Sequence, residues 1–257
     1  MNKKFFQRNH RIIIGIVVIL VVTVSVAAPP RQPLTRNIQV RVENGNLILL
    51  GNDLDSNIII TENGVSGRMG TTVNGQRHIF IPEAATHDVI ISMRGGNDFV
   101  QVELPGGNFT IPHDLVINTG PGNDMIELLQ VKAPNETRIN TGPGSDIVFI
   151  DGVLHPSGYI RSEFTGKFTL FAGRGADLLE FHNAIFHGSV DVRLGPGIDG
   201  ACSTEDSEFQ MPDQASFNGG FPSVFPGDGF VAHSLEFTNI TGFEDFPDDC
   251  SYLGGRF

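Results

Sequence analysis

Apolar and polar residues alternate in short runs along residues 44–203, and each run ends at glycines and small polar residues. Alternation with a period of two is typical of half-buried β-strands, and glycine-rich segments are typical of tight turns. After residue 30 no stretch shows the three-to-four-residue spacing of apolar side chains that an amphipathic helix requires. The pattern therefore predicts an all-β protein.

A recurring turn of glycines and an aspartate organises these runs. Its aspartates are 26, 22, 31 and 22 residues apart, with an apolar residue seven positions before each of them. The turns are Gly95-Gly-Asn-Asp98, Gly120-Pro-Gly-Asn-Asp124, Gly142-Pro-Gly-Ser-Asp146, Gly173-Arg-Gly-Ala-Asp177 and Gly195-Pro-Gly-Ile-Asp199. Each unit is therefore predicted to be a strand, a turn and a second strand.

A unit of this length cannot bury its apolar face alone, whereas stacked copies can. One turn motif per unit means that each unit makes one circuit and pairs in parallel with its neighbours. We expect a right-handed parallel β-helix or β-roll solenoid of about seven coils over residues 44–203, since crossover connections favour that hand. The alternative is an antiparallel β-sandwich, against which the fixed register within the units argues.

The pattern weakens at both ends of this region. Ser56 stands where an aspartate is expected, 42 residues before Asp98, so a further unit is predicted to hold residues 73–75 and 79–81. Residues 28–43 are assigned to a linker or N-terminal cap. Residues 204–257 are rich in phenylalanine and predict a C-terminal cap, tied by a disulfide between Cys202 and Cys250; an apolar docking surface for a partner is the alternative.

The N-terminus carries the features of a targeting segment. Residues 1–11 contain four basic side chains, residues 12–28 are uncharged, and Ser25-Val26-Ala27 is a small-x-small cleavage pattern. Residues 1–27 are typical of a secretory signal peptide. An uncleaved anchor through residues 12–28, the only membrane contact we predict, is the alternative, since seventeen residues is near the lower limit for a span. Either interpretation places the rest outside the cytoplasm, as a secreted, periplasmic or cell-surface protein.

Net charge narrows the choice of partners. The chain has a net charge of −12, and beyond residue 27 it has 13 basic against 29 acidic residues, a net charge of −16. Such a surface repels phosphate backbones, so nucleic acid is excluded as a partner. It attracts cations instead.

The stacked aspartates point to calcium. Adjacent carboxylates would repel each other by roughly 3 kcal/mol at about 5 Å before screening. Asparagine caps a turn equally well without charge, so a column that stays aspartate favours bound cations, and oxygen donors favour calcium over zinc or copper. We predict several Ca²⁺ ions, in a number the sequence does not fix. Their ligands would be the carboxylates of Asp98, Asp124, Asp146, Asp177 and Asp199 and the carbonyls of Gly96, Gly120, Gly122, Gly142, Gly144, Gly173, Gly175, Gly195 and Gly197.

Gly-Pro-Gly-Asn-Asp124-Met-Ile126 and the equivalent segments resemble the hemolysin-type (RTX) calcium-binding repeat, Gly-Gly-x-Gly-x-Asp-x-apolar-x. The resemblance covers about residues 44–203, in a long-period form similar to that of bacterial surface proteins. It implies a calcium-stabilised parallel β-roll or β-helix that is exported, often as part of an adhesin or exoenzyme. The chain departs from the hemolysin-type pattern in two ways. It has one motif per coil instead of two, and it carries the basic residues Arg94 and Arg174 in or beside the turns.

Other chemistry-bearing residues are few. His87-Asp88 and His113-Asp114 precede strands at equivalent positions, as a solvated polar ladder or a minor metal site. Asp151 and Glu163 could form an acid pair. No Gly-x-Ser-x-Gly, Walker or His-Glu-x-x-His motif is present.

We therefore expect an exported, calcium-binding β-solenoid that acts as a structural or cell-surface interaction module, with a surface glycan or protein as partner. The alternative is a β-helical lyase or hydrolase acting on an acidic polysaccharide, for which Arg138 and Arg193 are the first candidates. Only Lys132 and Lys167 remain as lysines beyond residue 30, and the chain has no tryptophan to stack on sugars. Enzyme activity is therefore the less favoured interpretation.

Overall fold

The computed structural model describes residues 35–105, 110–155, 158–203, 207–219, 229–232, 239–241 and 244–245. These residues form β-strands and one short 3-10 helix, η1 (Pro212–Gln214), which confirms the predicted all-β class. None of the helical structure in these ranges is long and apolar enough to cross a membrane. The segment on which the signal-peptide and anchor predictions rest lies outside the described residues.

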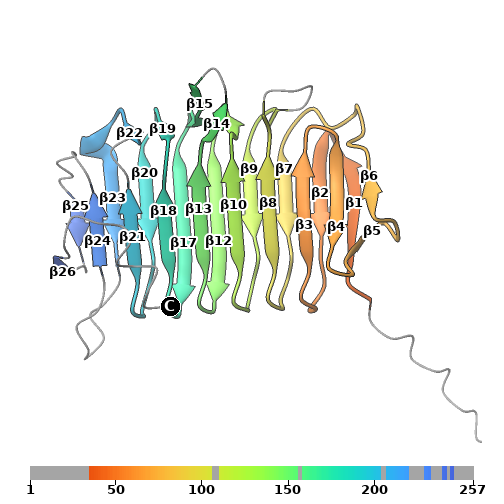
Figure 1. The fold of residues 1–257 in the computed structure, drawn as a ribbon, viewed down its shortest axis with the longest axis horizontal. Helices are drawn as coiled ribbons and strands as arrows, with labels where there is room; N and C mark the ends of the chain where they lie inside the picture. The colour runs from red at the N-terminus through yellow and green to blue at the C-terminus, as the bar shows by residue number, and fades with distance from the viewer. Residues whose placement is uncertain are drawn as a thin grey trace, which may run out of the picture. The chain divides into compact units, whose positions relative to one another are not determined.

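The first of two large sheets has ten strands in the order β25-β23-β20-β17-β12-β9-β7-β2-β1-β5 (Figure 1). From β2 to β25 all neighbouring strands are parallel. The strands are β1 (Asn37–Glu43), β2 (Asn46–Leu50), β5 (Thr72–Val73), β7 (Val89–Ser92), β9 (Leu115–Asn118), β12 (Thr137–Pro143), β17 (Phe168–Arg174), β20 (Val190–Arg193), β23 (Ala215–Asn218) and β25 (Asn239–Thr241).

The second large sheet follows the same pattern, in the order β26-β24-β21-β18-β13-β10-β8-β3-β4-β6. Its neighbours from β3 to β26 are also parallel. The strands are β3 (Asn57–Thr61), β4 (Gly64–Arg68), β6 (His78–Ile79), β8 (Phe99–Glu103), β10 (Met125–Leu129), β13 (Ile147–Asp151), β18 (Leu178–Phe181), β21 (Gly200–Ser203), β24 (Gly229–Ala232) and β26 (Glu244–Asp245).

Two smaller sheets complete the described structure. A parallel four-stranded sheet joins β11 (Lys132–Ala133), β16 (Ser162–Phe164), β19 (Ala184–Phe186) and β22 (Glu208–Phe209). An antiparallel hairpin joins β14 (Val153–His155) and β15 (Gly158–Ile160). The hairpin lies within the longest gap between turn aspartates, the 31 residues from Asp146 to Asp177.

Apolar rows run through the stacked strands in the predicted register. Ile91 pairs with Ile117, Ile117 with Ile139, and Ile139 with Leu170, and all four side chains are buried. Buried phenylalanines continue the core from β16 to β23, with rings in stacked or edge-to-face contact. They are Phe164, Phe168, Phe181, Phe186, Phe209 and Phe217. The core therefore passes without interruption from aliphatic to aromatic side chains.

Both ends of the stack differ from the prediction. Residues 64–79 do not form a further unit, because β3 pairs directly with β8 at a separation of 42 residues. Instead β4 runs antiparallel to β3, β6 antiparallel to β4, and β1 antiparallel to β2. At the other end, parallel pairing passes the predicted boundary at residue 203 and continues through β23 and β24.

Candidate functional site

The five glycine–aspartate turns connect a strand of the first sheet to a strand of the second. Parallel pairing places them one above another, as where Gly142 lies opposite Gly173 in β12 and β17. The turns approach so closely that a Cβ atom on Gly144 would lie 1.6 Å from the carbonyl oxygen of Gly122. Gly144 also has a φ of 159°. Close stacking therefore accounts for the glycines without a ligand.

The aspartates of these turns form a column, which we call the inner column. Each carboxylate accepts, through Oδ1, the backbone N–H of the aspartate in the preceding turn, and Asp98 accepts that of Ser56. The bonds are Ser56 N–H to Asp98 (2.7 Å), Asp98 to Asp124 (2.8 Å), Asp124 to Asp146 (2.9 Å), Asp146 to Asp177 (2.9 Å) and Asp177 to Asp199 (2.9 Å). The predicted stacking of the five acids is therefore present.

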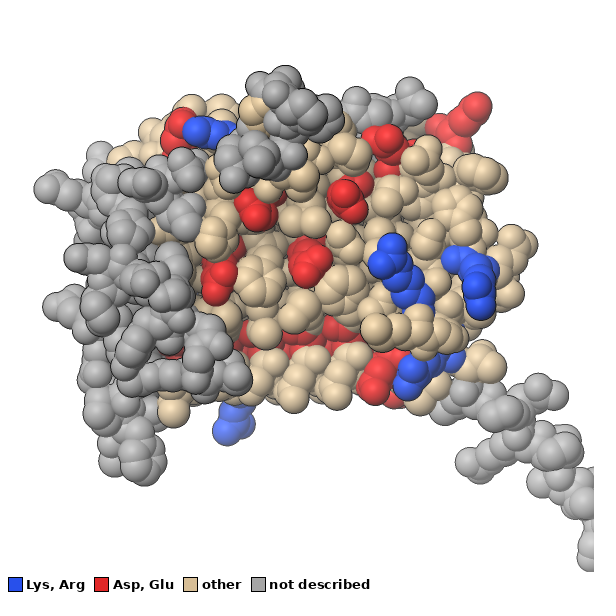
Figure 2. Space-filling model, viewed as in Figure 1, with Lys and Arg blue, Asp and Glu red and all other residues tan. Residues whose placement is uncertain are grey.

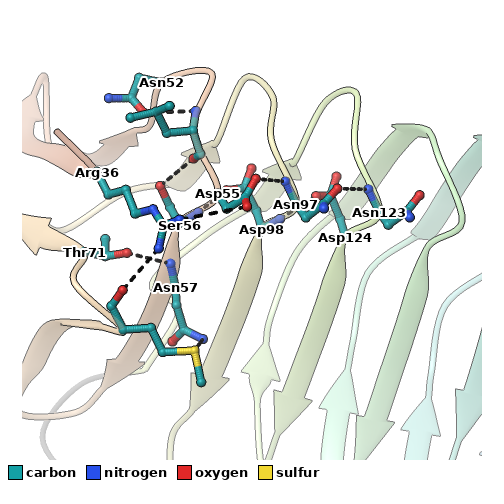
Figure 3. A network of polar contacts seen from close by, with 12 residues as sticks. Arg36, Asn52, Asp55, Ser56, Asn57, Thr71, Asn97, Asp98, Asn123 and Asp124 are labelled. Carbon is teal, nitrogen blue, oxygen red and sulfur yellow. Dashed lines mark hydrogen bonds and ion pairs between the residues drawn. The ribbon is translucent and has the colours of Figure 1, made fainter. Parts of the chain in front are cut away.

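The residues directly before the aspartates form a second, exposed column, the outer column. Here the hydrogen bonds run in the opposite direction, since the N–H of Asn97 donates to Asp55, that of Asn123 to Asn97, and that of Ser145 to Asn123. Figure 3 shows both columns side by side. In the turns that end at Asp98, Asp124 and Asp146, two successive backbone N–H groups are thus satisfied by side chains of neighbouring turns.

The inner column is buried. Its five aspartates are at most 3% exposed, and Figure 2 shows a band of acidic atoms between rows of other residues along the lower part of the face. The remaining oxygens, Oδ2 of Asp98, Asp124, Asp146 and Asp177, are buried without a hydrogen-bond partner within the described part of the chain. Buried polar atoms without partners are costly and rare, so these oxygens mark the inner column as the candidate site.

Burial shifts the titration of these acids upward. Burial raises the pKa of Asp98 to about 7. The hydrogen bond from the Ser56 N–H lowers this pKa, whereas repulsion from Asp124 raises it further. Burial likewise raises the pKa of Asp177 to about 7 and that of Asp146 to about 6. The pKa of Asp124 is also raised by burial, although the nearby Thr119 hydroxyl lowers it. The column therefore binds protons far more readily than ordinary aspartates do.

The fit of calcium to the turns is partial. The unpartnered carboxylate oxygens have the donor chemistry that calcium prefers, and a pocket at the first turn is lined by Asp98, Asp55 and Thr71. The glycine carbonyls fit less well, because those of Gly122 and Gly144 face the α-carbon of the next turn's glycine. Among His, Cys, Asp and Glu side chains of the described residues, no three inner-column acids converge on one point. The carboxylates, and not the glycines, are therefore the ligands that this geometry supports.

The sequence did not predict the outer column. Its signal was a polar residue directly before each of the first three turn aspartates, namely Asn97, Asn123 and Ser145. Ala176 and Ile198 interrupt that signal in the last two turns. Predicting it required knowing that the turns stack closely enough for side chains to reach backbone N–H groups of the neighbouring turn.

The other candidate residues have separate partners. Asp151 accepts a hydrogen bond from Asn183 at 3.3 Å, whereas Glu163 forms an ion pair with Lys132 at 3.4 Å. The two acids therefore have different partners, and their acid pair stays a prediction.

The two arginines proposed for catalysis each bind an acid two residues earlier in the chain. Arg138 pairs with Glu136 at 2.8 Å and Arg193 with Asp191 at 2.9 Å. Cys202 is buried and disulfide-bonded, while its predicted partner Cys250 lies outside the described residues.

Searches of the chain against family models, curated proteins and solved structures found no match. The resemblance to the hemolysin-type repeat therefore stays a prediction from the motif. Function has to be inferred from the geometry of this molecule.

Proposed function

We propose that the chain is an exported, right-handed parallel β-solenoid that acts as a structural or cell-surface interaction module. The observation that carries this proposal is the strand order. The chain passes repeatedly from the first large sheet to the second, and the neighbouring strands are parallel from β2 to β25 and from β3 to β26. Stacked repeats of this kind have a filled interior and offer their long outer faces to partners. The surplus of acidic side chains favours a partner of neutral or positive charge.

The second part of the proposal is that calcium binds the inner column through its carboxylates. Burying unpaired carboxylates costs free energy, and a divalent cation would offset that cost where protons are scarce. The unpartnered Oδ2 atoms of Asp98 and Asp177 support this assignment. A bound calcium ion would neutralise the negative charge of the column. The Oδ1 atoms would continue to accept the backbone N–H groups of the neighbouring turns.

A calcium titration tests the second part. In chelator-treated protein at pH 8, calcium chloride is expected to release or absorb heat and to raise the melting temperature. The Asp177→Asn variant should weaken the effect, whereas Asp191→Asn, on the outer side of β20 in an ion pair with Arg193, should not. Absence of heat together with an unchanged melting temperature would remove calcium from the proposal and leave the module intact.

The enzyme alternative has one observation in its favour. On and beside β18, His182 lies 3.1 Å from Glu180, and this hydrogen bond raises the pKa of His182. Burial raises the pKa of Asp151 nearby. Perturbed pKa values of neighbouring groups are frequent at catalytic sites, and glycoside hydrolysis uses a pair of acids.

Incubation with acidic polysaccharides separates the two functions. The module predicts co-sedimentation without new reducing ends or unsaturated products. Product formation that is lost in Glu180→Gln would instead establish the enzyme.

A further inference from the structure

A second group of acids lies at the opposite ends of the first-sheet strands, away from the turns of the inner column. The dipeptides His87-Asp88 and His113-Asp114 directly precede β7 and β9. Val89 pairs with Leu115 in those parallel strands, so the residues before them also lie one above the other. Neighbouring parallel strands are about 4.8 Å apart, which brings side chains from both dipeptides within reach of one ion.

Three ligand atoms meet at this point. Nδ1 of His113 lies 2.8 Å from Oδ1 of Asp88 and 3.3 Å from Oδ1 of Asp114. All three atoms lie within 4.8 Å of one another, and no other set of three His, Cys, Asp or Glu ligand atoms in the described ranges does so. An imidazole nitrogen and two carboxylate oxygens thus converge from two different strands.

The backbone holds the two carboxylates in place. Asp88 accepts the N–H of Asp114 at 3.2 Å, and Asp114 accepts the N–H of Glu136 at 3.1 Å. These bonds engage one oxygen of each carboxylate without neutralising its charge. Arg138, on the next strand of the sheet, forms an ion pair with Glu136. Among the described residues, the ion pairs of Asp88 and Asp114 are those with His113.

Solvent reaches this group. The side chain of His113 is 54% exposed, and those of Asp88 and Asp114 are 28% and 30% exposed. A metal ion could enter without rearrangement of the core and could complete its coordination with water. His87, the neighbour of Asp88 in the chain, is not one of the three converging residues, and its Nδ1 lies 3.1 Å from the Thr86 hydroxyl.

We propose that Asp88, His113 and Asp114 form a binding site for a divalent first-row transition metal such as zinc. Mixed nitrogen and oxygen donors favour these ions, whereas calcium favours oxygen donors alone. The site uses none of the residues assigned to calcium and does not depend on the proposed function. Zinc would replace the proton on Nδ1 of His113 and join β7 to β9 through side chains.

Isothermal titration of the chelator-treated protein with zinc chloride tests this site. We expect one zinc ion to bind, with affinity at least about tenfold weaker in His113→Ala and in Asp88→Asn. Asparagine at position 88 keeps an acceptor for the Asp114 N–H, so this variant should fold normally. His182→Ala, which removes a histidine paired with a single carboxylate, should bind zinc as the unmodified protein does.

Two further measurements keep the result unambiguous. Saturating calcium chloride should leave the zinc affinity unchanged, and so should Asp177→Asn in the inner column, because the two sites share no ligand. In an NMR titration, the ring signals of His113 should shift with zinc while those of His182 do not. Absence of zinc binding, or equal binding by His113→Ala, would overturn the proposal even if the calcium site stands.

Discussion

The two groups of acids use the same hydrogen bond in different surroundings. In the inner column and at Asp88 and Asp114 alike, a carboxylate accepts a backbone N–H from the neighbouring strand level. The inner aspartates are at most 3% exposed. The Oδ2 atoms of Asp98, Asp124, Asp146 and Asp177 have no hydrogen-bond partner among the described residues. Asp88 and Asp114 are about one-third exposed and contact a histidine.

This difference shows that solvation, more than residue type, sets the chemistry of an acid in a parallel stack. Burial raises the pKa of a carboxylate because desolvation disfavours its charged form, whereas a carboxylate that water reaches avoids most of that penalty. The net charge of the inner column therefore depends on whether protons or cations are bound to it. In the His113 group, by contrast, the three ligand atoms of Asp88, His113 and Asp114 already lie close together and are reached by solvent.

Glycine-to-alanine substitutions are expected to give the largest difference in stability between the two regions. Gly144→Ala should destabilise the fold by about 3 kcal/mol or more, because its Cβ would meet a backbone carbonyl at 1.6 Å and cannot be relieved by a side-chain rotation. Gly45→Ala, whose Cβ would meet the movable side chain of His87, should cost about 1–2 kcal/mol, chiefly from its positive φ. Urea unfolding of both variants measures this. Equal losses would contradict the close stacking of the turns.

A smaller effect of opposite sign is expected from Asp177→Asn. Asparagine keeps an oxygen for the Asp146 N–H and removes the buried charge, so we expect stabilisation of about 1–3 kcal/mol at pH 8 without calcium and a smaller gain at pH 4. Asp114→Asn is the matched control at the exposed group and should change stability by about 0.5 kcal/mol or less. Chemical unfolding at both pH values provides the comparison. Destabilisation by Asp177→Asn at pH 8 would show that the charged form is the favoured one.

The sequence predicted those features that depend on local periodicity. The inward rows containing Ile91, Ile117 and Ile139, and the stacking of the turns, follow from alternation and from glycines at fixed intervals. Local periodicity could not predict how the strands at the N-terminal end of the stack pair with one another. Residues 64–79 have strand-like composition, but whether they extend the stack or fold back antiparallel onto β3 depends on which sheet edge lacks a partner.

The hydrogen bonding and the burial of the aspartate side chains could not be predicted from the sequence either. Their spacing predicted a charged column, but not that Oδ1 would accept an N–H or that Oδ2 would be enclosed. Both depend on the distance between turns, which the glycines set by allowing the backbone of Gly144 to contact that of Gly122. The His113 group was visible as two His-Asp dipeptides, and only the register of β7 and β9 brings them together.

The pH dependence of stability in chelator-treated protein tests the burial of charge in the inner column most directly. The folded-state pKa of Asp98 and Asp177 is about 7, above the ordinary value of 3.8, so the folded state holds more protons than the unfolded chain between these values. Their contribution to stability is complete below about pH 4 and is lost as the pH rises through about 7. We predict that the free energy of unfolding falls by a few kcal/mol from pH 4 to pH 8. A free energy of unfolding that rises over this range would contradict the account.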